Sequence, residues 1–447
     1  MIASLEPFPS CTPTSDPTRH RARRRARRLI VIAADDLAEW RRGWRIVAGA
    51  AIGMGTGILL YLMMMSLFIT HLTREFGWTR GDIGVANMVA FGTGAVALPI
   101  VGRLLDRFGF RPMVLVCVPA LAMVYVAMSM ERGYFPFHLA VMVWGGIFGA
   151  GTAAIAYTRP VIAAFERQRG LALGVATAGT SLTGMIVPPI LGVTIAAYGW
   201  RAGLYAMAAL TALVGLPIAL ALIGRAGDAQ ARVSDEVASG RWVAVGQANT
   251  RDATLGEAMR GARFWLLAVA LAAVNIPGSG IVGHLAPLIG DKGLSDAAAA
   301  LEVSFYAAGL LAGRLVTGFS LDRWPAPAVG ALMTLVPAVG VVLLLIPSPS
   351  FTLAAIAILL VGVQQGSEID LVAYFVSRSF GAGHYGAIYG AVAVAGALST
   401  GVALVFFGRV HDLTGSYDLA LIVGAVAFCV GAGAFGSIGL VREDGIY

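Results

Sequence analysis

The chain has 447 residues, of which 58% are hydrophobic and only 13% are charged. Soluble domains carry about 25% charged residues, so this composition indicates a membrane protein and excludes an ordinary soluble enzyme. The net charge is +7, and the three cysteines (Cys11, Cys117 and Cys429) are scattered, which predicts neither a disulfide framework nor a thiolate metal site. We expect no metal and no cofactor.

The first 45 residues form a basic segment, with RHRARRRARR at residues 19–28. Such a run is compatible with a nucleic-acid-binding arm or with a cytoplasmic anchor beside a membrane helix. The adjoining apolar segment favours the anchor, and we expect no nucleic-acid partner. The run is not typical of a cleavable signal peptide, because no short apolar region with a cleavage site follows the arginines.

Apolar stretches long enough to cross a bilayer recur twelve times along the chain, since a membrane helix needs about 20 residues. The excess of arginine and lysine on one side places both termini in the cytoplasm of a multi-pass protein of the cell (inner or plasma) membrane. The predicted spans are 46–70, 83–102, 113–130, 138–163, 171–197, 204–223, 264–289, 297–319, 328–347, 352–377, 385–408 and 419–440.

The two halves of the chain repeat at a constant offset of 216 residues, which places Gly102, Asp106 and Arg107 on Gly318, Asp322 and Arg323. Two parallel repeats with a site between them are typical of secondary transporters. We therefore predict an all-α polytopic protein whose twelve helices form two six-helix bundles. The predicted parts are a basic tail (1–45), a first bundle (46–223), a cytoplasmic loop (224–263), a second bundle (264–440) and a tail (441–447). The end of the loop, TLGEAMRGARFW, is compatible with a short amphipathic surface helix.

The loop after the second span reads GRLLDRFGFR (102–111), and the weaker copy GFSLDR stands at 318–323. This pattern resembles the signature loop of the major facilitator superfamily. The resemblance implies a latch that holds the two bundles together in the outward-facing state. Its expected members are Gly102, Asp106, Arg107, Gly109, Arg111, Gly318, Asp322 and Arg323, with Glu166 as a partner for the arginines.

Three further stretches, EFGWTRGDIG (75–84), ERQRGLALGVATAG (166–179) and AGRLVTGFSLDR (312–323), resemble the monocarboxylate and oxalate/formate transporter branch. The resemblance implies that Arg314, four residues before Gly318, binds a substrate carboxylate. Two departures concern proton coupling: Leu310 stands where several members of the branch have an aspartate, and spans one and eleven lack the membrane lysine of some members.

Arg159, Arg314, Glu368 and Asp370 lie inside predicted spans and at similar depth, and none is duplicated in the other half. Arginine suits an anionic substrate, although Arg314 can also reach headgroups or Asp322, and Arg159 can be interfacial. Glu368 and Asp370 lie about 200° apart on a helix, so they face different sides. We expect an arginine–carboxylate network across spans four, eight and ten, in which one acid pairs with an arginine and the other exchanges a proton. The alternative is a static pair that ties span ten to its neighbours.

Asn275, Gln364 and Tyr61 are further candidates for substrate contact, and Glu302, near the outer end of span eight, is expected to be wetted. We predict a monomeric secondary active transporter that moves a small organic anion, most simply a monocarboxylate, by alternating access with proton symport. The alternative is an antiporter that exchanges carboxylates or exports a drug against protons; GMIVPPILG (184–192) partly resembles the antiporter motif. An enzyme is not expected, because no nucleophile, metal cluster or phosphate loop is recognisable.

Overall fold

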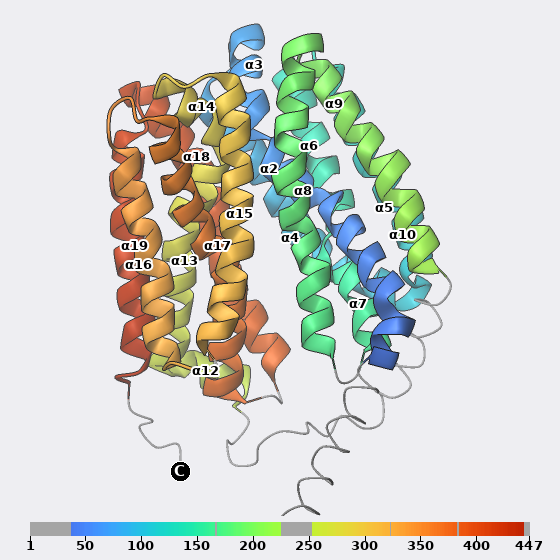
Figure 1. Cartoon of the computed structure of the whole chain (residues 1–447), viewed down its shortest axis with the longest axis vertical. Coiled ribbons are helices and arrows are strands. Elements are labelled where there is room, and N and C mark those ends of the chain that lie inside the picture. The colour runs from blue at the N-terminus through green and yellow to red at the C-terminus, as the bar shows by residue number, and fades with distance from the viewer. Residues whose placement is uncertain (1–36, 166–167, 225–252, 322, 382–383, 442–447) are drawn as a thin grey trace, which may run out of the picture.

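The computed structural model describes residues 37–165, 168–224, 253–321, 323–381 and 384–441, and in these ranges the side chains at 106, 169, 385 and 386 are not described. The chain folds into two helical bundles that stand side by side, one from each half of the sequence (Figure 1). The predicted all-α, two-bundle architecture is confirmed.

The first bundle begins with a helix over Leu37–Gly55 and contains ten further helical segments. Its segments are α2 (Ile58–Met64), α3 (Ser66–Phe76), α4 (Arg80–Phe108), α5 (Phe110–Ser129), α6 (Phe135–Ala150), α7 (Ala154–Ala164), α8 (Arg169–Tyr198), α9 (Trp200–Ala209), the π-helix η1 (Leu210–Gly215) and α10 (Leu216–Leu222).

The second bundle is preceded by the short helix α12 (Leu255–Arg260), which Thr254 and Glu257 cap reciprocally. This helix occupies the place of the expected surface helix, and Ala253 N donates to Phe380 O at its start. The bundle consists of α13 (Ala262–Gly283), α14 (Leu285–Asp291), α15 (Asp296–Leu321), α16 (Ala326–Leu344), α17 (Phe351–Phe380), α18 (Tyr385–Thr414) and α19 (Asp418–Ile438).

Eleven helical stretches of the described residues are long and apolar enough to span a membrane, and the bent pair Leu37–Gly55 with Ile58–Met64 makes a twelfth. Three predicted spans are not single helices. The first bends by 44° at Gly55–Gly57, the fourth breaks between α6 and α7, and the seventh breaks at His284. The first two breaks meet, because Ile58 N donates to Thr152 Oγ1 at 3.0 Å, which satisfies a backbone group that the bend leaves without a helical partner.

Helices α15 and α17 pack backbone to backbone through two glycines on each helix. A Cβ at Gly309, Gly313, Gly362 or Gly366 would lie 2.0–2.2 Å from a backbone oxygen of the other helix. Close approach through small residues is how membrane helices gain packing energy, since lipid provides no hydrophobic drive. Helices α15 and α17 are therefore in direct backbone contact along this stretch.

The bundles touch each other at the end of the molecule that carries α3 and α14, called here the closed end. On α4 and α18, Gly84 lies against Leu404 and Gly408 against Arg80, while on α8 and α15 Gly184 lies against Ala307. Toward the opposite end, which carries α12, a Cβ on Gly102, Gly170, Gly174, Gly318 or Gly390 would meet no atom of the other bundle within 4 Å. At these glycines the two bundles are therefore in contact toward the closed end and out of contact toward the opposite end, as in a transporter.

Candidate functional site

A cavity of about 230 Å³ lies between the two bundles. Its first wall belongs to the first bundle and is apolar, made of Leu59, Leu62, Met63, Met65 and Phe91. Its second wall belongs to the second bundle and carries the polar groups, from Asn275, Ser279, Tyr306, Gln365 and Thr400. Cavities of this kind, largely apolar with a few converging polar groups, are typical of small-molecule sites.

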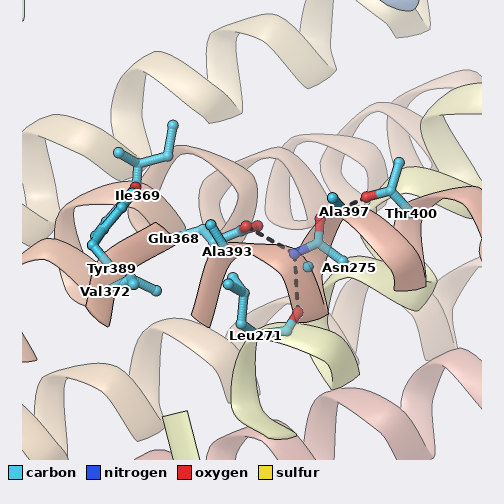
Figure 2. A pocket seen from close by; sticks show the side chains of 10 residues that line it. Leu271, Asn275, Glu368, Ile369, Val372, Tyr389, Ala393, Ala397 and Thr400 are labelled. Atoms are coloured by element: carbon cyan, nitrogen blue, oxygen red, sulfur yellow. Dashed lines mark hydrogen bonds between the residues drawn. The ribbon is translucent and has the colours of Figure 1, made fainter. Parts of the chain in front are cut away.

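A smaller pocket of about 140 Å³ lies inside the second bundle, between α13, α17 and α18, and shares Asn275 and Thr400 with the larger cavity. Glu368 lines this pocket, and its carboxylate points at the Asn275 amide (Figure 2). Asn275 Nδ2 donates to Glu368 Oε1 at 2.8 Å, and Gln365 Nε2 donates to Glu368 Oε2 at 2.7 Å. Both oxygens of the acid are thus held by neutral amides.

The hydrogen-bond chain continues from Asn275 across to α18. Thr400 Oγ1 donates to Asn275 Oδ1 at 3.1 Å, and the Ser279 and Thr400 hydroxyls lie 3.0 Å apart. The carboxyl in the small pocket is therefore connected through one amide to hydroxyls on the wall of the large cavity.

Glu368 has no cationic partner within 4.0 Å among the described residues. Its hydrogen-bond partners are amides from spans seven and ten, and the expected network, in which one acid pairs with an arginine and the other exchanges a proton, stays a prediction. Helix geometry separates the two acids as predicted, and Glu368 is the one that lines the pocket.

Arg314 lies on α15 one turn beyond Leu310, a residue of the large cavity, toward the α12 end. Its Nε is buried and has no hydrogen-bond partner among the described residues, and its guanidinium makes no ion pair within 4.0 Å with a described carboxylate. A partly buried guanidinium with an open donor is equipped to hold a carboxylate through its planar fork.

The other predicted contact residues lie in different surroundings. Asn275 lines both pockets, whereas Tyr61 is buried in the first bundle, where its hydroxyl donates to Asn87 Oδ1 at 2.7 Å. Gln364 is fully buried, and in the described part of the chain neither of its amide atoms has a hydrogen-bond partner. Arg159 lies half-buried on α7, in the other bundle from Arg314. Tyr61 and Gln364 thus do not line either cavity.

The predicted latch is only partly described. Gly109 has φ +81°, a left-handed value that requires glycine at this turn, and the Arg107 guanidinium lies over the Phe108 ring. Arg323 folds back on its own helix, where it donates to Phe319 O at 3.1 Å. Arg111 is half-buried. The Asp106 side chain, Glu166 and Asp322 lie outside the described residues, so the latch stays a prediction.

Charged residues at the closed end join the two bundles, and sequence reasoning missed them. The Arg80 guanidinium donates to both oxygens of Asp291, at 2.5 and 2.9 Å, and Arg409 pairs with Asp82 at 3.0 Å. Asp412 accepts from the backbone N–H groups of Arg80 and Gly81, the first residues of α4. His411 Nε2 lies 3.1 Å from Asp291. These contacts close this end of the cavity.

Glu302 on α15 departs from expectation. It is fully buried, and neither carboxylate oxygen has a hydrogen-bond partner among the described residues, whereas we expected it to be wetted.

The family is given by comparison with known proteins. The model of the Major Facilitator Superfamily matches residues 46–404, most of the chain. The chain belongs to the major facilitator superfamily. It is therefore a multi-pass membrane transporter and not an enzyme. This membership agrees with the two bundles, the cavity between them and the contacts at one end.

Similar members of the superfamily include human monocarboxylate transporter 11, which is 25% identical over 90% of this chain and 83% of that protein. Monocarboxylate transporter 13 of Bos taurus is 22% identical over 88% of each chain. A chloramphenicol resistance protein of Streptomyces lividans is 27% identical over 63% of this chain and 67% of that protein. The two monocarboxylate transporters thus match over nearly the full length of this chain.

Proposed function

We propose that this superfamily member moves a small organic anion, most simply a monocarboxylate, by alternating access together with a proton. The observation that carries the proposal is the pair of unlike groups on the second bundle: Arg314 with an open Nε donor, and the cation-free carboxyl of Glu368. The first supplies a charge for a carboxylate, and the second supplies a site for a proton. The similarity to monocarboxylate transporters over about nine-tenths of the chain supports the same substrate class.

In this proposal the closed end faces the outside, since the arginine-rich loops and both termini are expected in the cytoplasm of the cell membrane. The ion pairs of Arg80 and Arg409 then shut the outer gate, which makes the described conformation inward-facing. The latch around Asp106 and Arg107 would close the opposite end in the outward-facing state.

Uptake into proteoliposomes tests the proposal with a panel of radiolabelled small monocarboxylates. An inward proton gradient should stimulate uptake, and a protonophore should abolish the stimulation. Arg314→Lys should lower uptake by about tenfold or more, because an ammonium lacks the planar fork. Arg260→Lys on the exposed surface of α12 is the matched control. Unchanged uptake by Arg314→Lys and Arg314→Ala would exclude the carboxylate-binding role.

An antiporter is the second candidate, and one observation favours it. Glu368 lies in a pocket that no described cation lines, beside a large cavity with a mainly apolar lining, and this arrangement suits exchange of a proton for a lipophilic cation or neutral drug. The similarity to a chloramphenicol resistance protein points the same way. Exchange predicts carboxylate uptake only into vesicles preloaded with counter-substrate, and drug export predicts proton-driven accumulation of tetraphenylphosphonium in inverted vesicles.

A further inference from the structure

The side chain of Gln365 lines the large cavity, donates to the acid of the small pocket, and has one polar atom without a partner among the described residues. Its Nε2 donates to Glu368 Oε2 at 2.7 Å, and the residue lines the large cavity. Its Oε1 is buried and accepts no hydrogen bond from any described residue. This oxygen lies against α13, only 2.6 Å from the point that a Cβ on Gly278 would occupy, so the absent side chain at Gly278 leaves the room in which the amide sits.

The other amide on Glu368 is fixed at both ends. Asn275 Nδ2 donates to Leu271 O at 2.9 Å as well as to Glu368, and Asn275 Oδ1 accepts from Thr400 at 3.1 Å. Reversal of the Asn275 amide would place its nitrogen beside the donating hydroxyl of Thr400 and its oxygen beside the accepting oxygens of Leu271 and Glu368. Reversal of the Gln365 amide would break a single bond, the one to Glu368.

Protonation of Glu368 changes what its neighbours must supply. An ionised carboxylate only accepts hydrogen bonds, and two amide N–H donors satisfy it. A protonated carboxyl carries one O–H donor, which requires an acceptor inside the protein. Because the terminal torsion of glutamine is broad and roughly two-fold, the Gln365 amide can turn over and offer Oε1 as that acceptor. The amide nitrogen then moves to the place that Oε1 occupies now.

We propose that Gln365 is a positioning residue that links the protonation of Glu368 to anion binding in the large cavity, a role that rests on the proposed function. With Glu368 ionised, its negative charge and the buried amide oxygen of Gln365 both lie beside the cavity, and both disfavour an anion. With Glu368 protonated, the charge is gone and Gln365 turns its two N–H donors to the α13 side of the wall. Proton and anion therefore bind together.

The groups that surround Glu368 favour the Gln365 amide as the one that responds to its protonation. The titratable groups that face it from neighbouring helices are the phenols of Tyr306 on α15 and Tyr389 on α18. The polar groups that face it from α13 and α17 are Asn275 and Gln365, and no described cation pairs with it. Of the two hydrogen-bonded partners, only Gln365 has an unused acceptor.

Infrared difference spectroscopy of the purified full-length protein, recorded between alkaline and acidic buffer, tests the amide reversal without any substrate. The C=O band of protonated Glu368 is identified by its loss in Glu368→Gln. Gln365→Met, which keeps length and removes the amide, should shift this band, because the acid loses its acceptor. Ser399→Ala, whose hydroxyl serves only its own helix at Gly396, is the control. An unshifted band in Gln365→Met would overturn the inference.

Proteoliposome uptake of a radiolabelled monocarboxylate tests the link. In Gln365→Met the ratio of the rate with acidic to that with neutral external buffer should fall toward unity, while Ser399→Ala keeps the wild-type ratio. Gly278→Ala retains the amide but fills the space beside it, and it should lower the same ratio. A shifted band with a wild-type ratio in both variants would contradict the linking role. Wild-type uptake that does not depend on pH would instead contradict the proposed function. A shifted Glu368 band in Gln365→Met would still support the reversal of the Gln365 amide.

Discussion

The ion pair between Arg80 and Asp291 gives the sharpest prediction about conformation. It joins the first residue of α4 to the last residue of α14, across the two bundles, through two hydrogen bonds. Arg80 also lies over the Tyr417 ring, with 5.3 Å from Cζ to the ring centroid. Arg80→Ala removes all of these contacts and leaves Asp291 with His411 alone. We expect the closed end to open more often in this variant.

The size of the effect follows from burial. Hydrogen bonds to charged groups contribute about 1.5–3 kcal/mol, whereas exposed ion pairs contribute about 0.2–1 kcal/mol. The Arg80 and Asp291 side chains are 16% and 33% exposed, so the pair lies between these cases, at about 2 kcal/mol. Since 1.36 kcal/mol corresponds to a factor of ten, the ratio of closed to open molecules should fall roughly 30-fold.

Electron-spin distance measurements between labels at Tyr134 and Leu413 report the opening. These side chains are 68% and 85% exposed and lie at the closed end of different bundles. Arg80→Ala should move the population toward longer distances, and the exchanged pair of Arg80→Asp with Asp291→Arg should restore part of it. Lys292→Ala, which breaks a 3.0 Å pair with Asp418 inside one bundle, is the control. A distance distribution unchanged from wild type would refute the gate.

Three stability predictions follow from thermal melts in detergent. Gly309→Ala should lower the free energy of unfolding by about 1–3 kcal/mol, because its Cβ would lie 2.1 Å from a backbone oxygen of α17. Gly318→Ala on the same helix is the control, since its Cβ would meet no atom within 4 Å. Equal melting temperatures of the two variants would contradict the tight packing. Glu302→Leu should stabilise by about 1–3 kcal/mol by removing a buried carboxyl without partners, and a lower melting temperature would reveal a hidden partner. The hydrogen bond from Arg201 lowers the pKa of the Glu75 carboxyl, so its stabilisation is present at neutral pH and is lost as the pH falls through the lowered value; Glu75→Gln should therefore lose less stability on acidification.

The spans could be predicted from the sequence because lipid imposes a length and an apolar composition on each of them. The helix breaks could not. Glycine is so frequent in this chain that Gly55 and Gly57 carry no special signal, and the bend depends on Thr152, nearly a hundred residues away. Only the assembled bundle determines which glycine interrupts a helix.

The charged residues of the site could be predicted from the sequence, but their hydrogen-bond and ion-pair partners could not. Glu368 and Arg314 are conspicuous because ionisable residues are rare inside spans. Asn275 and Glu368 are 93 residues apart in the sequence, and no local sequence pattern predicts their contact. The residues of the closed end, such as Arg80 and Asp412, sit at span ends, where charges are ordinary, so their pairing across the bundles leaves no pattern in the sequence.

The two walls of the large cavity come from different halves of a duplicated protein. The apolar wall, with Met63 and Phe91, belongs to the first bundle, while the acid and its amides belong to the second. On the proposed function, the groups that hold the carboxylate and the proton are therefore all encoded in the second half of the gene. Substitutions at Met63 or Phe91 in the first half should change the preference for the apolar body of the substrate and leave the proton dependence of uptake in place.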